Sequence, residues 1–393
     1  DAPVVLGGDG DGIVDAAGAG LLPEAGVLLA SSALDDAALT DALDRAADLV
    51  LTDSNRRRSQ IWFYGLQDTR GHTERAGEVA VDPRGYDFRL EPFASDDDDD
   101  RTVVEHEGGT VEVTSDGGTD RSEDRGTRAL DGDPTTAWRV GGPDPVGQAI
   151  TVAPDPAPTT DHLRLLQPPS AATGRALSVV RVTVGEGPAM EVALGPESLE
   201  PPGQLVRFPE QPVRRVEVVV AGVVGGTAAD PFTPVGLAEL SIDTVQVTEV
   251  VRLPVDLLDR VGERLDGHGL DVVLTRLRAE PADPTRLDEE ARLERRFELP
   301  VARTFEVTGA ARPAGLPVAA LPPEACRDDL LAVDGEPVAV RVVAAPTGHA
   351  TVEACAPLVL AAGSHRVSAA AGDRTGWDLD QVVLSTDAAG NGV

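Results

Sequence analysis

The sequence predicts a mainly β protein, made of a jelly roll and a second β-sandwich, with a small α/β domain at the N-terminal end. Many apolar residues after residue 100 alternate with polar ones, as in Val180-Arg-Val182-Thr-Val184, and this is the spacing of half-buried strands. Clusters of Gly, Pro and Asp separate these runs, as turns do. The length of 393 residues is too great for one compact core, so we expect several domains.

Residues 1–93 have a different pattern from the rest. Apolar runs at 4–6, 27–30 and 49–52 have the length of buried strands, and residues 35–47 carry apolar side chains at helical spacing. Strands that alternate with helices are typical of a parallel β-α-β layer. The segment is short for such a layer, which leaves open whether the α/β domain is complete.

Residues 94–101 contain five consecutive aspartates, Asp96 to Asp100. Adjacent carboxylates repel one another and stay solvated, so we expect an acidic linker here. A dedicated cation site is the alternative, although Ca²⁺ sites need ligands from a shaped loop.

The remaining chain divides into two β segments. Residues 102–250 contain strand-like runs such as Val216-Glu-Val218, and we assign them to the jelly roll. Residues 251–393 continue in the same style with runs such as Val338-Ala-Val340, and we assign them to a C-terminal β-sandwich.

Charge and motif content exclude several classes of function. The net charge is −33, and every residue in the Lys-plus-Arg count of 34 is Arg. A protein with this negative charge repels nucleic-acid phosphates and anionic lipid surfaces. We therefore exclude both as partners. No stretch reaches the roughly 20 apolar residues of a membrane span. No His spacing typical of a metal site or catalytic triad and no GxSxG motif is present, although a glycosidase pair among the many carboxylates stays open.

The sequence has two cysteines, Cys326 and Cys355. In an exported protein, two cysteines between short predicted strands are expected to form a disulfide. Two buried free thiols are the alternative. No CxxC spacing accompanies them, which argues against a metal site.

The most informative motif is RALDGDPTTAW at residues 128–138. Asp131 and Gly132 predict a tight turn, because Gly readily takes a positive φ. Trp138 is one of three tryptophans and would fill the end of a barrel. The motif resembles the signature of discoidin domains, also called F5/8 type C domains or family 32 carbohydrate-binding modules, which are jelly rolls.

That resemblance implies a structural Ca²⁺ in this loop. The positions that match the family's ligands are Asp131, Thr136 and the later Glu239, with Asp133 as a further candidate and backbone carbonyls near Ala129 completing the shell. Hard oxygen ligands of this kind suit Ca²⁺. The alternative is that Asp131 and Asp133 only cap a turn.

A second resemblance covers most of the chain in colinear order. The chain is similar to the extracytoplasmic C-terminal region of actinobacterial membrane arabinofuranosyltransferases, through GGDGDGIVD at 7–15, LTDSNRRR at 51–58, TRGHTE at 69–74 and LAAGSHR at 360–366. In that family the catalytic acid lies in a multispanning membrane part. The resemblance therefore implies a non-catalytic role in glycan binding or architecture, outside the cytoplasm. Its implied partners are cell-wall arabinan or a lipid-linked glycan, and the membrane domain of the full-length protein.

Four residues are candidates for sugar binding. Arg56 lies in an Arg cluster, which could hold an anionic ligand or form internal salt bridges. Trp62 and Tyr64 are aromatic side chains that could stack on sugar rings or anchor a core. Trp377 lies beside Asp378 in a predicted loop, where it could be an exposed platform or a buried core residue.

Two other functions stay open at this point. The chain could be a secreted glycoside hydrolase with accessory β domains, its carboxylate pair hidden among the acids. It could also be a scaffold that packs on a membrane domain and binds no sugar.

Overall fold

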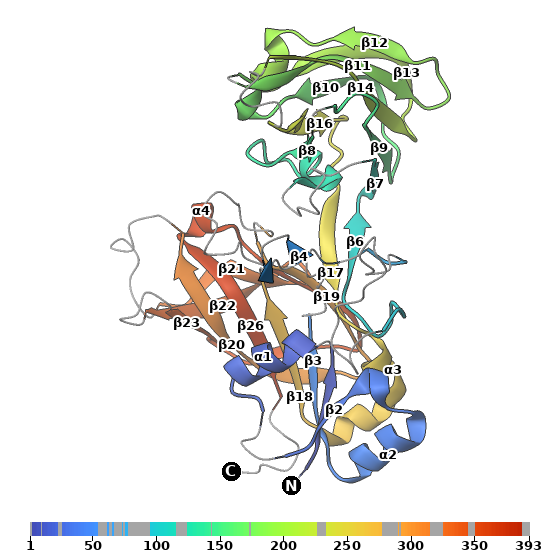
Figure 1. Cartoon of the computed structure of the whole chain (residues 1–393). Helices are drawn as coiled ribbons and strands as arrows, with labels where there is room; N and C mark the ends of the chain where they lie inside the picture. Colours follow the sequence, from blue (N-terminus) through green and yellow to red (C-terminus); the bar gives the residue numbers. More distant parts are fainter. Residues whose placement is uncertain are drawn as a thin grey trace. The chain divides into compact units, whose positions relative to one another are not determined.

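The computed structural model of the chain is mainly β, as the sequence predicts (Figure 1). It describes residues 2–8, 10–22, 26–53, 61–62, 65–66, 73, 75–77, 95–114, 124–142, 144–172, 174–225, 233–276, 290, 292–314, 325–344 and 350–386. In this part of the chain, no helix is long and apolar enough to cross a membrane.

The contacts divide the chain into two compact units. Unit 1 consists of residues 1–105 and 250–393, and unit 2 of residues 106–249. The segments 1–93 and 251–393, which the sequence analysis treats as separate domains, therefore belong to one unit. The reason is that their strands join in a single sheet.

The α/β part of unit 1 has a four-stranded parallel layer. Its strands lie in the order β2 (Leu28–Ala30), β1 (Val4–Gly7), β3 (Asp48–Thr52) and β18 (Leu270–Thr275). Helix α1 (Gly10–Gly18) packs on the face that carries Val4 and Leu6, whereas α2 (Asp36–Asp44) and α3 (Asp256–Val261) pack on the face that carries Val5. The apolar runs therefore form strands that are buried on both faces, as parallel strands usually are.

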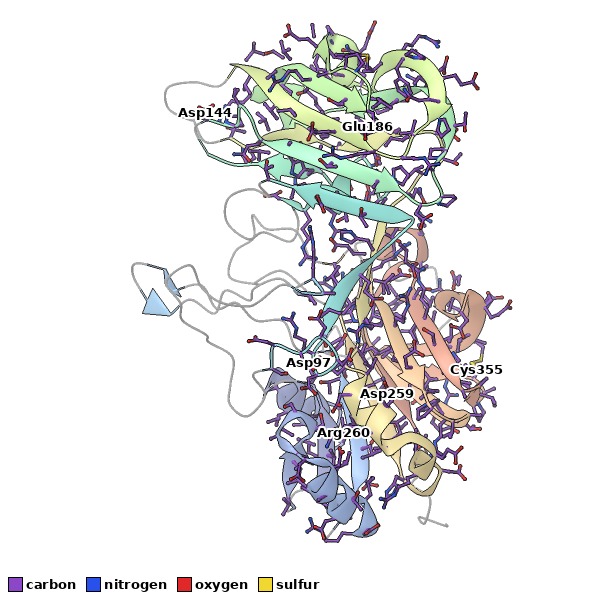
Figure 2. The ribbon with its side chains drawn as sticks, turned by 90° about the vertical axis from the view of Figure 1, so that its right-hand side faces the viewer. Asp97, Asp144, Glu186, Asp259, Arg260 and Cys355 are labelled. Carbon is purple, nitrogen blue, oxygen red and sulfur yellow. A yellow bond between two sulfur atoms is a disulfide. The ribbon has the colours of Figure 1, made fainter. Side chains whose placement is uncertain are left out.

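Two polar contacts set the positions of the helices on the second face. The Asp35 carboxylate accepts a hydrogen bond from the backbone N–H of Ala38, which caps α2. The guanidinium of Arg260 in α3 contacts Asp36 at 3.1 Å and Asp256 at 2.9 Å, and donates to the Leu34 carbonyl at 2.6 Å (Figure 2). Arg260 therefore ties α3 to the start of α2.

The same sheet continues through the C-terminal strands. Beyond β18 the order is β26 (Trp377–Ser385), β20 (Arg303–Pro313), β23 (Ala350–Ala354), β22 (Glu336–Ala344), β21 (Arg327–Val333), β25 (Gly363–Ala369), β19 (Glu294–Leu299), β17 (Thr248–Arg252) and β6 (Val103–Glu107). The short strand β24 (Leu358–Leu360) pairs with β20. Residues of β19 and β26, such as Phe297 and Leu384, share one core cluster. The sheet must therefore curve strongly to bring them together.

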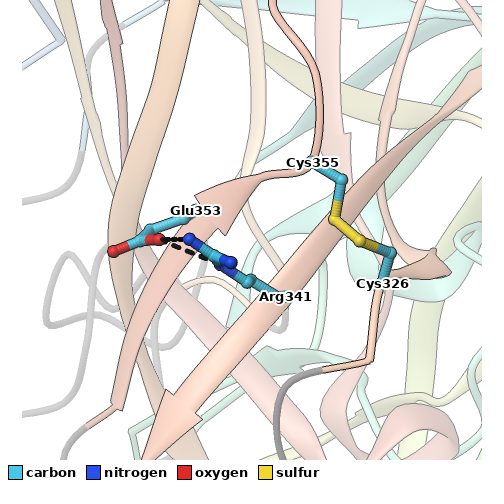
Figure 3. The surroundings of a disulfide bond; sticks show 4 residues. All are labelled: Cys326, Arg341, Glu353 and Cys355. Carbon is cyan, nitrogen blue, oxygen red and sulfur yellow. Dashed lines mark hydrogen bonds and ion pairs between the residues drawn. A yellow bond between two sulfur atoms is a disulfide. The ribbon is translucent and has the colours of Figure 1, made fainter.

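Cys326 and Cys355 form a disulfide in this unit (Figure 3). Cys326 lies just before β21 and Cys355 just after β23. Arg341 of β22 and Glu353 of β23 form an ion pair nearby, with the guanidinium Nη2 2.5 Å from Oε2. The disulfide therefore joins the ends of two strands that both neighbour β22.

The acidic run within 94–101 is packed in unit 1. The Asp98 carboxylate accepts hydrogen bonds from the guanidinium of Arg101, whose side chain is 1% exposed. The carbonyl of Asp98 accepts from Arg252, and the carbonyl of Asp99 accepts from the first residues of α3. Asp96, Asp97 and Asp99 are exposed, as expected of a solvated segment, and Arg side chains and backbone hydrogen bonds hold the segment to unit 1.

A buried ion network lies at the carboxyl end of β3. Asp53 and Arg295 are both fully buried, and their side chains form an ion pair. Both Nη atoms of Arg295 also donate to the Glu290 carboxylate, at 2.9 and 2.8 Å. The Asp53 carboxylate also accepts from the backbone N–H of Thr275 at 2.8 Å. These bonds connect β3, β18 and β19. Burial opposes the charge of Arg295, but the carboxylates of Glu290 and Asp53 raise its pKa above the usual value.

Unit 2 is a β-sandwich. One sheet has the order β12 (Met190–Ala193), β11 (Arg175–Val184), β14 (Val216–Gly225), β9 (Ala149–Pro154) and β7 (Gly109–Val113). The second has β13 (Gln204–Pro212), β10 (Thr159–Leu166) and β16 (Glu239–Ser241), and a short pair joins β15 (Val235–Leu237) to β8 (Trp138–Val140). Inward-facing residues of both sheets form one core, which includes the fully buried Trp138. The alternation in the sequence therefore marks the inner faces of the two sheets.

Candidate functional site

The motif at 128–138 forms a tight acidic loop between the 3₁₀ turn Gly126–Ala129 and β8. Gly132 has a φ of 77°, so the chain turns where a side chain would be strained. The Asp131 carboxylate accepts a hydrogen bond from the backbone N–H of Asp133 at 2.9 Å, which closes the turn. Trp138 lies in the core behind the loop. The loop is therefore a local turn whose C-terminal end is anchored in the core by the indole of Trp138.

The hydroxyl of Thr136 lies at the centre of a group of oxygen atoms. Its Oγ1 is 3.0 and 2.9 Å from the two carboxylate oxygens of Asp131, 3.1 Å from the carbonyl oxygen of Arg128 and 2.9 Å from that of Asp133. A hydroxyl has one hydrogen to donate. The single hydroxyl hydrogen therefore cannot satisfy all four of these acceptor oxygens at once.

Glu239 adds a second carboxylate from β16. Its Oε1 atom is buried and has no hydrogen-bond partner among the described residues. Burial, followed by the charges of Asp131 and Asp133, raises the pKa of Glu239 from 4.5 to about 8. Burial also raises the pKa of Asp131, against the opposing effects of its hydrogen bonds and of Arg128. The site therefore holds more negative charge than its own cations neutralise.

The donor set fits a hard cation. Carboxylate, hydroxyl and carbonyl oxygens are the ligands that Ca²⁺ prefers. In the described part of the chain, no group of three or more His, Cys, Asp or Glu side chains is arranged to hold a metal, so a cation here would depend on the hydroxyl and carbonyl oxygens as well. The nearest cationic group is Arg128 Nη1, 3.7 Å from the Asp131 carboxylate.

The Asp133 carboxylate caps a turn, which is one of the two interpretations that the sequence offers. Its carboxylate Oδ1 accepts hydrogen bonds from the backbone N–H of Thr135 at 2.9 Å and from the Thr135 hydroxyl at 2.6 Å. Only its backbone carbonyl joins the oxygen group around Thr136. Both aspartates thus cap turns, and Asp131 also belongs to the oxygen group around Thr136.

An ion pair between Arg125, just before the 3₁₀ turn, and Glu249 has no local signal in the sequence. Arg125 Nη1 lies 2.6 Å from Glu249 Oε2, and the Thr127 hydroxyl donates to Glu249 Oε1 at 2.7 Å. Burial opposes the charge of Glu249, but Arg125, Arg128 and Thr127 lower its pKa to about 2. Glu249 is 124 residues from Arg125, so sequence spacing alone could not have linked them.

Of the four predicted sugar-binding residues, Trp377 is the one whose side chain lies in the described part of the chain. Trp377 is 5% exposed and belongs to the core of unit 1, so its indole is not a platform for a sugar. It opens β26, where inward-facing positions fill the core. Arg56 and Tyr64 lie outside the described residues. Trp62 is described only through its backbone, in β4 (Ile61–Trp62).

Comparisons with solved structures give matches over nearly the whole chain. No model of a known protein family matches the chain, and no curated protein matches its sequence. The cryo-EM structure of arabinofuranosyltransferase AftD from Mycobacteria matches 95% of this chain with a TM-score of 0.58 at 15% identity. The chain shares the fold of a region of an arabinofuranosyltransferase. A mutant form of AftD gives a TM-score of 0.57 at 14% identity over the same share.

This region is a minor part of that enzyme. The chain spans 40% of the length of the AftD structure. A family 32 carbohydrate-binding module of C. perfringens NanJ, solved in complex with galactose, matches 34% of this chain and 91% of that module at 22% identity, with a TM-score of 0.25.

Proposed function

We propose that this chain is a non-catalytic, carbohydrate-binding accessory region of a cell-envelope glycosyltransferase. The observation that carries the proposal is the fold match to AftD, which extends over 95% of the chain and thus includes both units. The glycan is arabinan or a related furanose polymer, free or lipid-linked. The region works outside the cytoplasm, where a disulfide such as Cys326–Cys355 persists.

Ca²⁺ is the proposed structural cofactor of unit 2. Asp131, Thr136 and Glu239 would hold it through side-chain oxygens, and Arg128 and Asp133 through their carbonyls. The ion would neutralise the excess charge of the acidic loop and fix its conformation. Extracellular modules bind Ca²⁺ with dissociation constants of about 10⁻⁴–10⁻³ M, so a site of this affinity is filled outside the cell.

The raised pKa of Glu239 beside another carboxylate is also a pattern of acid–base catalysis. The burial of Glu239 Oε1 favours a cation ligand over a catalytic acid, because a glycosidic oxygen must reach the acid that protonates it. The hydrolase alternative is kept as an outcome of the test below.

The test titrates the whole chain with α-arabinofuranosyl oligosaccharides by calorimetry, with xylo-oligosaccharides as the pyranose control. We expect micromolar-to-millimolar binding of the furanose series and at least about tenfold weaker binding of the control, which is a difference of about 1.4 kcal/mol. The titration is repeated after removal of calcium with EDTA. No binding of any oligosaccharide would leave the scaffold alternative, and release of arabinose would favour the hydrolase.

A further inference from the structure

Unit 1 has a groove of about 260 Å³ on β19, β21 and β25, next to the short helix α4 (Gly372–Thr375). Small side chains form part of its floor. Ala332 of β21 and Ser368 of β25 lie side by side in the strand register, and Glu294 of β19 lies on the other side of Ser368. Ala370 and Ala371 continue the floor toward α4. The small side chains leave a depression between longer polar neighbours.

The rim of the groove carries charges of both signs. Arg292, Glu294, Asp328, Asp329 and Arg374 all line it. The Asp329 carboxylate forms an ion pair with Arg327, whose Nη2 lies 2.7 Å from Oδ2. In the described part of the chain, Asp328 and Arg374 have no ion pair or side-chain hydrogen bond, so they are available to a ligand.

Glu294 is the buried acid of the groove lining. It is 7% exposed, and its Oε1 accepts from Arg366 Nε at 2.8 Å. Its Oε2 is buried and lies 2.9 Å from Arg292 Nε. The two guanidinium groups therefore hold this carboxylate in the groove wall, and the exposed Asp328 and Arg374 are the charged groups that a ligand can reach.

The chemistry of the lining selects the class of ligand. Two guanidinium groups and three carboxylates line the groove, so its charges attract an anion only weakly. A neutral molecule with many hydroxyls can form hydrogen bonds with both kinds of group. None of the lining residues is aromatic, which disfavours pyranoses that stack a flat apolar face on a ring. The volume is just below the roughly 300–1,000 Å³ of small-molecule sites, which is enough for one or two sugar units.

We propose that this groove in unit 1 holds one or two furanose units of the glycan. Asp328 accepts from the sugar hydroxyls, and Arg374 donates to their oxygens. The inference rests on the proposed function, and it places the sugar contact on unit 1 and away from the calcium loop of unit 2.

The experiment compares binding of an α-arabinofuranosyl oligosaccharide to the whole chain and to two groove variants, Asp328→Ala and Arg374→Ala. Each variant loses charge-assisted hydrogen bonds, so we expect the dissociation constant to rise about tenfold or more. The matched controls are Asp259→Ala in α3 and Arg45→Ala after α2, which remove the same residue types from exposed positions of unit 1. The controls should bind like the unchanged chain. Thermal melting of every variant separates a loss of contacts from a loss of folding. If Arg374→Ala melts early, Arg374→Gln replaces it.

Each outcome separates the two proposals. If the unchanged chain binds and both groove variants bind equally well, the groove assignment is wrong and the proposed function stands. If the unchanged chain binds no furanose or pyranose oligosaccharide, both proposals fall. If only the groove variants weaken, the sugar contact is in unit 1.

Discussion

At the scale of single residues, the hydroxyl of Thr136 tests the calcium proposal directly. Thr136→Val keeps the shape of the side chain but removes the oxygen that contacts Arg128, Asp131 and Asp133. We expect Ca²⁺ to raise the melting temperature of the unchanged chain but to have little effect on the variant, because its ligand set is incomplete. Differential scanning calorimetry with and without millimolar Ca²⁺ measures this.

Thr110→Val, at an exposed position of β7 in the same unit, is the control for Thr136→Val. It should keep the full response to Ca²⁺. Equal responses of both variants would exclude the loop as the site.

Glu239 gives the site a defined pH dependence. Its pKa is about 8 in the folded chain, against 4.5 for an ordinary glutamate, so the folded state binds more protons over this range. The associated stability is fully present below about pH 4.5 and is lost as the pH rises through about 8. Without calcium, the melting temperature of the unchanged chain should therefore fall relative to that of Glu239→Gln by several degrees between these pH values.

Calcium should reverse the pH effect of Glu239, because the ion stabilises the charged carboxylate. Melting curves of both proteins across this pH range, with EDTA and with Ca²⁺, measure the difference between them. Glu191→Gln on β12 removes an exposed carboxylate of the same type and should follow the unchanged chain. If the curves of the unchanged chain and Glu239→Gln stay parallel under all conditions, then Glu239 has an ordinary pKa.

At the scale of elements, the buried Asp53–Arg295 pair connects the end of β3 with β19. Asp53→Ala leaves Arg295 buried with less compensation, so we expect a loss of about 3–5 kcal/mol in the free energy of unfolding of unit 1. Urea denaturation followed by circular dichroism measures it. Asp41→Ala removes an exposed partner of Arg45 and should cost less than about 1 kcal/mol. Similar losses in both variants would mean that the network contributes little.

The disulfide acts on the same unit through the unfolded chain. It closes a loop with a sequence separation of 29 residues, for which the entropy of loop closure predicts a contribution on the order of 3 kcal/mol. The double variant Cys326→Ser, Cys355→Ser should lower the midpoint of unit 1 in urea and leave that of unit 2 unchanged. The single intrinsic probe Trp138, in the core of unit 2, reports on the second unit when Trp62 and Trp377 are replaced by Phe. A shift of both midpoints would contradict this assignment.

At the scale of the whole molecule, the division into two units predicts separate folding. Unit 2 has its own closed core and its own candidate ion site. We expect residues 106–249 expressed alone to fold and to keep the calcium-dependent melting of the full chain. Two-dimensional NMR and calorimetry check this. A dispersed spectrum that collapses in EDTA is still compatible with the prediction, whereas an unfolded fragment in saturating Ca²⁺ would contradict it.

Most of the local features were predictable from the sequence, because they depend on neighbouring residues. The alternation of apolar and polar residues predicts the inner faces of the unit 2 sheets. The loop of Asp131 and Thr136 spans only a few residues, so its turn and its group of oxygen atoms appear together in the motif. The two cysteines have no partner but each other. Glu239 entered the prediction through the family resemblance, since no spacing rule connects it with Asp131.

Only the tertiary structure decides which distant segments meet. Strand period and turn chemistry are local properties, whereas the choice of a strand's neighbour depends on contacts between segments far apart in the chain. Asp53 and Arg295, 242 residues apart, show this most clearly, because their pairing joins two segments that sequence patterns assign to separate domains. The same reason explains why Trp377 is a core residue and why the groove around Glu294 has no motif: both depend on how β19, β21, β25 and β26 curve around one core.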